Sequence, residues 1–204
     1  MRKSTLTLLV TGILSLVYVN GIAWRYATIR NEGKTVYLQL APVDPISLVQ
    51  GQYMQLAFDI ETWHDDLQDN DLRLFAANPN AGALAVLKLD ANQVGTVSRL
   101  IPENPSPSLL KELNREYGSS GYALLSVEVD SKFRHHTRNQ SKNSDNEPRT
   151  TSIRLRQNSF LFKENTPETY DQARYGIFRV TRTGKYVLID LAGEDFRAMT
   201  AVKK

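Results

Sequence analysis

A long segment without charge follows the first three residues. Ser4–Trp24 contains no Asp, Glu, Lys or Arg, and most of its side chains are apolar. A helix of about 20 apolar residues matches the hydrocarbon thickness of a bilayer, about 30 Å. A segment in hydrocarbon satisfies its own backbone N–H and C=O groups by forming a helix. The segment therefore predicts one transmembrane helix, and we assign residues 1–32 to an N-terminal membrane anchor.

Residues that flank this segment predict its orientation. Arg2 and Lys3 precede it, Arg25 follows it, and Trp24 and Tyr26 lie near its far end. Basic residues are enriched on the cytoplasmic side of a span, and aromatic rings favour the headgroup level. We expect a single-pass protein of the cell inner membrane with a cytoplasmic N-terminus. The main domain would then lie in the periplasm or outside the cell.

Two other interpretations of the same segment stay open. Gly21-Ile22-Ala23 has small residues at the spacing of a signal-peptide cleavage site, so cleavage after Ala23 would release a soluble protein. A run of this length can also be a buried core helix. Asn20 and the aromatic flank favour an anchor over a cleaved signal, and the length of the segment favours a span over a core helix.

The rest of the chain, residues 33–200, shows the alternation of a β-rich domain. In the first strand Val36, Leu38 and Leu40 share one face, and Tyr37 and Gln39 share the other. Strands are predicted at 34–40, 53–60, 84–90, 93–100, 122–130, 152–162, 177–182 and 185–191. Short helices are predicted at 45–50, 108–117 and 168–174.

Turn signals connect these elements. Asp90-Ala91-Asn92 and Thr183-Gly184 each join two strands into a hairpin, and Gly33 would end the first helix in a left-handed conformation. Short strands without βαβ alternation imply antiparallel pairing. The predicted fold is mainly β, an antiparallel sheet or barrel-like domain with two or three short helices behind one N-terminal transmembrane helix.

Composition narrows the function classes. The chain has no Cys, which excludes thiol nucleophiles, disulfides and cysteine-ligated metals. The net charge is +3, but basic residues concentrate in 1–30 and 131–156 and leave the remainder acidic. This distribution argues against a nucleic-acid-binding face. Residues 131–151 contain one large apolar residue, Phe133, so we expect a mobile polar insertion there.

Two patches of the sequence carry a family resemblance. One comprises Pro42-Val43-Asp44-Pro45 and Gly51-Gln52-Tyr53-Met54-Gln55-Leu56-Ala57-Phe58. The other comprises Tyr170, Ala173-Arg174-Tyr175-Gly176 and Phe178-Arg179-Val180. Together they resemble the GDYXXLXY family of bacterial membrane-anchored proteins, which is functionally uncharacterised. The chain departs from the motif where Gln52 replaces Asp and Phe58 replaces Tyr. The resemblance implies an anchor with an extracytoplasmic β-domain, often associated with multi-spanning membrane proteins.

The motif residues are the binding candidates: Asp44, Pro45, Gly51, Tyr53, Leu56, Arg174, Tyr175 and Gly176. Asp44 is suited to cap a short helix that begins with Pro45, and Gly51 to close the turn. Arg174 can pair with Asp44 or with a carboxylate ligand. These residues either hold the turn by capping and packing, or form a groove for a ligand or partner.

Other clusters predict no metal site and no cofactor. Glu61, Asp65, Asp66, Asp69 and Asp71 form an acidic cluster with His64, but no glycine lies between Gly51 and Gly82 for a calcium-binding turn. We interpret the cluster as a solvated loop. His135-His136 has no evident third ligand.

The predicted function is a non-enzymatic binding or accessory module for another membrane or envelope protein. One alternative is a membrane-anchored serine hydrolase of signal-peptidase-like type, in which Ser47 would be the nucleophile and Lys88 the nearest basic residue. The other is a small-ligand binder that is secreted after cleavage.

Overall fold

The computed structural model describes residues 3–41, 53–61, 63–64, 82–131, 151–157, 159–161, 170 and 172–202. The predicted turn at 45–50 lies outside the described residues. So do most of the acidic cluster and the polar insertion between its end residues Ser131 and Thr151.

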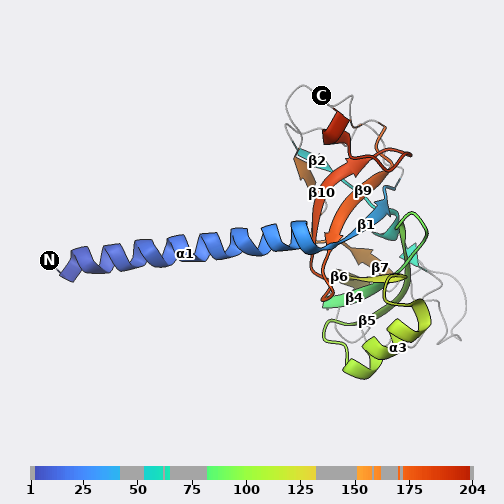
Figure 1. The fold of residues 1–204 in the computed structure, drawn as a ribbon, viewed down its shortest axis with the longest axis horizontal. Helices are drawn as coiled ribbons and strands as arrows, with labels where there is room; N and C mark the ends of the chain where they lie inside the picture. Colours follow the sequence, from blue (N-terminus) through green and yellow to red (C-terminus); the bar gives the residue numbers. More distant parts are fainter. Residues whose placement is uncertain are drawn as a thin grey trace, which may run out of the picture.

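The N-terminal helix projects from the rest of the protein (Figure 1). Helix α1 spans Lys3–Glu32, and its segment Thr7–Glu32 is long and apolar enough to cross a membrane. The most apolar stretch of that segment has no residue buried against the chain. The expected apolar helix is therefore confirmed, and the core-helix interpretation is wrong.

The first sheet continues directly from α1. Its order is β1-β9-β10, all antiparallel, with β1 at Lys34–Gln39, β9 at Tyr175–Val180 and β10 at Tyr186–Ala192. The predicted hairpin between β9 and β10 is confirmed. Gly184 sits in its turn with φ +83°, which favours glycine. A bulge interrupts β10 between Leu188 and Asp190.

A second antiparallel sheet lies beside the first (Figure 1). Its order is β3-β7-β6-β4-β5, with β3 at Trp63–His64, β7 at Thr151–Arg154, β6 at Tyr122–Ser131, β4 at Gly82–Leu89 and β5 at Gly95–Pro102. The predicted β4–β5 turn is confirmed, since Asp90 Oδ1 accepts the backbone N–H groups of Asn92 and Val94. A parallel bridge from Tyr37 to Val94, the residue before β5, links β1 to this sheet.

Two predicted strands are wrong in their extent. The strand predicted at 152–162 is divided between β7 and β8, Ser159–Leu161, which pairs with β2, Tyr53–Gln55. The strand predicted at 53–60 ends with β2, and the chain then forms the 3₁₀ helix η2 at Asp59–Glu61. Alternation continues beyond the end of β2: Leu56, Phe58 and Ile60 are buried around exposed Asp59. Alternation of apolar and polar side chains indicates which face of a segment is buried, but it does not indicate where strand pairing by backbone hydrogen bonds ends.

Helix α3, Pro107–Tyr117, confirms the helix predicted at 108–117 and the residues predicted to begin and end it. The Ser106 hydroxyl accepts the N–H of Leu109, Pro107 begins the helix, and Gly118 ends it with φ +72°. The other predicted helix, 168–174, is wrong in its last three residues, which are not helical. There the backbone of Arg174 donates to Ala192 O and accepts from Leu40 N, and these bonds extend the first sheet.

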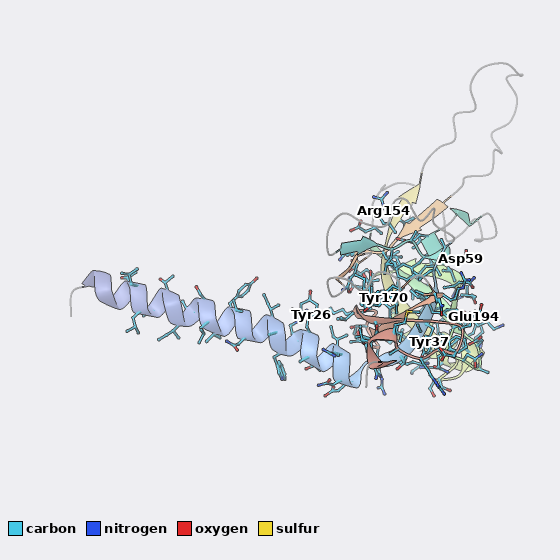
Figure 2. All side chains as sticks on the ribbon, turned by 90° about the horizontal axis from the view of Figure 1, so that it is seen from above. Tyr26, Tyr37, Asp59, Arg154, Tyr170 and Glu194 are labelled. Carbon is cyan, nitrogen blue, oxygen red and sulfur yellow. The ribbon has the colours of Figure 1, made fainter. Side chains whose placement is uncertain are left out.

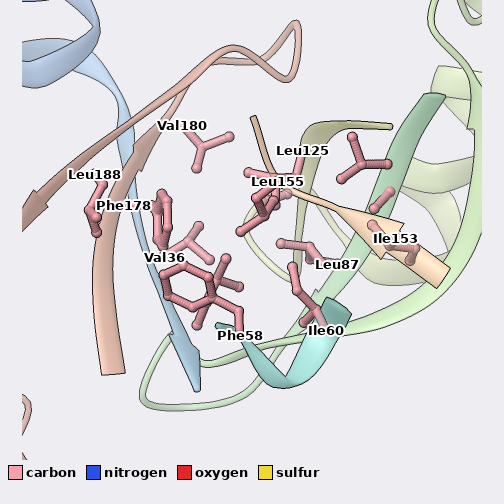
Figure 3. Packing of buried hydrophobic residues seen from close by; sticks show 14 of the residues in the cluster. Val36, Phe58, Ile60, Leu87, Leu125, Ile153, Leu155, Phe178, Val180 and Leu188 are labelled. Atoms are coloured by element: carbon pink, nitrogen blue, oxygen red, sulfur yellow. The ribbon is translucent and has the colours of Figure 1, made fainter. Parts of the chain in front are cut away.

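The main core fills the space between the sheets (Figure 3). Phe58 and Phe178 meet edge to face with ring centroids 5.2 Å apart, and both side chains are fully buried. A second cluster lies on the outer face of the larger sheet, where Leu113 of α3 packs against Val86 and Leu124. Strand β4 is therefore buried on both faces, and its position is central to the domain.

Candidate functional site

The two sequence patches that carry the motif meet in the core. Phe58 forms a bridge with Leu40 of the chain beyond β1, and its ring covers Gly176 of β9. A Cβ atom on Gly176 would lie 2.6 Å from Cε1 of Phe58 and 3.0 Å from the Phe178 ring. Leu56 is also buried, with 5% of its surface exposed. These positions favour packing as the role of Leu56 and Gly176.

A group of three aromatic side chains, Tyr37, Tyr175 and Phe196, lies on the other face of the first sheet. We call it the aromatic corner. The Tyr175 and Phe196 ring centroids are 4.8 Å apart, and those of Tyr37 and Phe196 are 5.2 Å apart. The Tyr37 hydroxyl donates to the Phe196 carbonyl at 3.2 Å. All three side chains are half-buried, so their outer faces are available to a partner.

Charged side chains edge the aromatic corner. Arg174 Nε lies 3.8 Å from Glu194 Oε1, and both side chains are largely exposed. Figure 2 shows Tyr37 and Glu194 on the side of the β-domain that faces away from the free part of α1. Tyr37 and Phe196 were missed as candidates from the sequence. The sequence did indicate the position of Tyr37: it lies between Val36 and Leu38, which face the core, so its side chain is on the opposite face of β1.

The remaining candidates are described only in part. Asp44, Pro45 and Gly51 lie outside the described residues, so the Asp44 cap and the Asp44–Arg174 pair stay predictions. For Tyr53 the structure describes the backbone, which pairs with Leu161 in the β2–β8 ladder. Of the groove proposed from sequence, the structure describes the side chains of Arg174 and Tyr175, which contact Glu194 and Phe196 respectively.

Glu61 has a different environment from the one expected. The sequence placed it in a solvated acidic loop, and this is wrong for Glu61 itself. Its Oε2 accepts the N–H of Phe58 at 3.0 Å, and its Oε1 accepts the N–H of Leu155 at 2.8 Å. The half-buried carboxylate therefore joins η2 to the end of β7, two segments far apart in the sequence.

Asp190 is a buried carboxylate that sequence reasoning missed. It is 5% exposed and follows the β10 bulge. Its Oδ1 accepts the N–H of Leu191 at 2.8 Å, and its Oδ2 accepts both the N–H and the hydroxyl of Thr200. Donors from the 3₁₀ helix η3, Met199–Val202, thus satisfy this carboxylate and attach η3 to β10. The sequence could have indicated this residue, because alternation along the predicted strand places Asp190 on the same face as Leu188, and a buried carboxylate needs hydrogen-bond donors.

The junction between α1 and the β-domain is a single tightly packed residue. Helix α1 ends at Glu32 as predicted, but the left-handed conformation expected for Gly33 is wrong. Gly33 is required instead by close packing. A Cβ there would lie 2.5 Å from Ile29 O and 3.0 Å from both Arg179 Cβ and Val180 N. Arg179 Nη1 also donates to the Gly33 carbonyl at 3.0 Å, which places a cation at the helix C-terminus.

Lys34 continues this attachment on the domain side. Its Nζ donates to the carbonyls of Ser120 at 2.5 Å and Tyr122 at 3.0 Å. Burial lowers the pKa of the Lys34 ammonium below its usual value. With the Gly33 contacts, these bonds connect the helix end to both sheets without a linker.

A cleft of about 660 Å³ opens beside this junction, between α1 and the β-domain. Five residues of α1 line one side: Tyr18, Ile22, Arg25, Tyr26 and Ile29. The β-domain contributes Ser126, Arg156, Gln157, Lys185 and Tyr186. We call this feature the junction cleft. Its described lining residues include three cations and no Asp or Glu.

Comparison with known proteins assigns the chain to a family. The family model for GDYXXLXY proteins matches residues 15–191. The chain belongs to the GDYXXLXY family. No curated protein and no solved structure matches it.

The matched range gives the family a structural outline. It begins within α1 and ends at Leu191 in β10, so it includes the junction and both sheets. The Phe58–Gly176 contact therefore joins two parts of the GDYXXLXY match that are more than a hundred residues apart. The aromatic position that ends the motif serves core packing in this family member.

The described part of this GDYXXLXY protein contains no group of three or more His, Asp or Glu side chains placed to hold a metal ion. Ser47, the nucleophile of the hydrolase alternative, lies outside the described residues. Lys88, its nearest basic candidate, is exposed on β4. A base that activates serine needs to lie within hydrogen-bond reach of it, and lysine bases are usually buried, unlike Lys88.

Proposed function

We propose that the chain is a membrane-tethered, extracytoplasmic β-domain that acts as a non-enzymatic binding module for another membrane or envelope protein. The exposed apolar surface of α1 is the observation that carries this proposal. Leu8 is 74% exposed, Leu16 68% and Val19 62%, and no part of the β-domain covers them. Water is an unfavourable solvent for so large an apolar surface, and lipid or the helices of a membrane protein would cover it.

The junction adds a geometric argument. Gly33 is the one residue between α1 and β1, and its contacts with Arg179 and Val180 hold the helix end against the domain at a set distance and orientation. A catalytic domain that acts on dissolved substrate gains little from this attachment. A module that must present one surface to a neighbour in the same membrane does gain from it, because preorganisation lowers the entropic cost of association.

The aromatic corner is the proposed contact surface for the partner. Aromatic and arginine side chains are enriched among the residues that dominate interface energy. Tyr175 and Phe196 are already ordered by ring packing, so little side-chain entropy would be lost when they bind. Arg174 and Glu194 at the edge can provide polar contacts around the aromatic centre.

Membrane attachment and orientation can be measured directly. We expect the full chain to stay in the membrane fraction through washes with high salt and alkaline carbonate, and release into the soluble fraction would contradict the anchor. The chain contains no Cys, so Lys111→Cys on α3 introduces a unique thiol. We expect an impermeant maleimide to label it in cells whose inner membrane is intact. Labelling only after lysis would place the domain in the cytoplasm.

A photo-crosslinking amino acid at position 175 tests the partner surface. We expect an adduct with one membrane or envelope protein, identified by mass spectrometry. The same amino acid at Lys111, on the α3 side of the domain, is the matched control and should give no such adduct. Phe196→Ala should weaken the adduct at 175 because it removes the ring that orders Tyr175. Equal adducts from both positions, or none at 175, would contradict the assigned surface.

A further inference from the structure

The junction cleft straddles the predicted membrane surface. The uncharged segment ends at Trp24, and Arg25 is the first charged residue after it. Lining residues Tyr18 to Ile29 cover about 16 Å of helix axis, centred near that boundary. The cleft would therefore extend from the outer hydrocarbon to the headgroups when α1 spans a bilayer. This placement uses the membrane attachment proposed above, and it is independent of any protein partner.

One face of α1 forms the helical wall. Tyr18, Ile22, Arg25, Tyr26 and Ile29 follow the three- and four-residue spacing of a single helix face. Ile22 is 38% exposed, compared with 73% for Trp24 on another face, because the β-domain approaches Ile22. Figure 2 shows Tyr26 in the stretch of α1 nearest to the β-domain. The wall offers apolar surface toward the membrane core and a cation at the headgroup level.

The opposite wall adds two cations and a hydroxyl. Arg156 pairs with Glu128 through Nε at 3.2 Å, and the side chains of Arg25 and Lys185 have no acidic partner among the described residues. The Tyr186 hydroxyl accepts the N–H of Arg156, which leaves its proton without an acceptor in the described part of the chain. Arg25 on one wall and Arg156, Lys185 and Tyr186 on the other therefore line the same cleft, where cations outnumber the one paired carboxylate of Glu128.

We propose that the junction cleft binds the headgroup of an anionic phospholipid. Arg25 and Lys185 contact the phosphodiester from the two walls, and Tyr186 donates a hydrogen bond to it. The acyl chains follow Ile22 and Tyr18 along α1 into the hydrocarbon. Basic side chains at a membrane surface attract anionic lipid, and the aromatic rings suit the interface. The bound lipid fills the space between helix and domain and stabilises their relative orientation.

Lipid retention by the purified full chain tests the proposal. The chain is titrated with phosphatidylglycerol in detergent micelles, and bound lipid is counted by native mass spectrometry. The test variant is Arg25→Gln with Lys185→Gln. Each cation that contacts the headgroup contributes about fivefold to affinity, so we expect a loss of about 25-fold. The matched control is Arg30→Gln with Arg182→Gln. It removes equal charge from the same helix and hairpin turn, outside the cleft lining, and should change affinity by less than twofold.

Two further arms define the ligand. Arg25→Lys with Lys185→Arg keeps both charges and should retain most of the lipid, while circular dichroism verifies that every variant is folded. Phosphatidylcholine should be retained at least tenfold more weakly than phosphatidylglycerol. Inorganic phosphate at the same concentration should not displace the lipid.

Three results would overturn the proposal. They are equal loss in the cleft and control variants, equal retention of phosphatidylcholine, or displacement by phosphate, which would identify a free anion as the ligand. The assay contains no partner protein and needs no carbonate wash, so its failure is distinct from a failure of the proposed function.

Discussion

The Phe58 ring occupies the space that a side chain on Gly176 would need, with Cε1 2.6 Å from the position of the missing Cβ. The contact connects the end of the GDYXXLXY motif to the central strand of the first sheet. The contact requires glycine at position 176, because a planar ring can lie flat on a backbone only where no Cβ projects.

Gly176→Ala should destabilise the protein through this contact. Phe58 is fully buried against Phe178, so it has no free volume to move into. Overpacking of this kind costs about 1–3 kcal/mol. Urea unfolding of the full chain in micelles measures the loss. Gly193→Ala is the control, since the nearest atom to its Cβ would be 3.6 Å away, and it should be nearly neutral. Equal losses at the two glycines would contradict the steric explanation.

Glu61→Ala should destabilise more than an ordinary surface substitution. It leaves the N–H groups of Phe58 and Leu155 without their acceptor, and each unsatisfied buried donor costs about 1–3 kcal/mol. Glu61→Gln keeps one acceptor oxygen and should lose about half as much. The same urea assay compares them with Glu194→Ala, which removes an exposed ion pair with Arg174 and should cost less than about 1 kcal/mol. If Glu61→Ala matched Glu194→Ala, the Glu61 carboxylate would have no such role.

Gly33→Ala should loosen the attachment of α1. Its Cβ would collide with backbone atoms of Ile29 and Val180, which cannot rotate away as a side chain can. We expect a broader distribution of distances between spin labels placed on α1 and on α3 in micelles. Val180 belongs to the main core, but most of that core and the second cluster beside α3 lie away from Gly33, so a large part of the stability of the β-domain should remain. An unchanged distance distribution would show that the junction tolerates the Cβ.

Stability should fall at alkaline pH through Tyr186. Burial raises the pKa of the Tyr186 hydroxyl above its usual value of 10.0. The unfolded chain therefore loses this proton at lower pH than the folded chain, and the free energy of unfolding decreases as pH rises above 10. Subtracting the unfolding free energy of Tyr186→Phe at each pH isolates this residue. The difference should be constant below pH 10 and decline above it, whereas a flat difference to pH 12 would contradict the burial effect.

Local features could be predicted from the sequence because their causes are local. The uncharged Ser4–Trp24 run predicts an apolar helix by length alone, and Ser106, Pro107 and Gly118 indicate the ends of α3 because capping involves neighbouring backbone groups. The turns at Asp90 and Gly184 follow from the same chemistry. Alternation also identifies the buried face of each strand, since side chains of a strand alternate between its two faces.

Tertiary structure decided which distant groups meet. The apolar residues of 152–162 predicted a single strand, and only the structure shows that β7 and β8 belong to two different sheets. The charge of Glu61 suggested solvent, and only the approach of η2 to Leu155 made it a hydrogen-bond acceptor. The Phe58–Gly176 contact, the aromatic corner and the junction cleft likewise combine segments far apart in the chain. Residue patterns are set by local preference and burial, whereas these contacts depend on the path of the whole backbone.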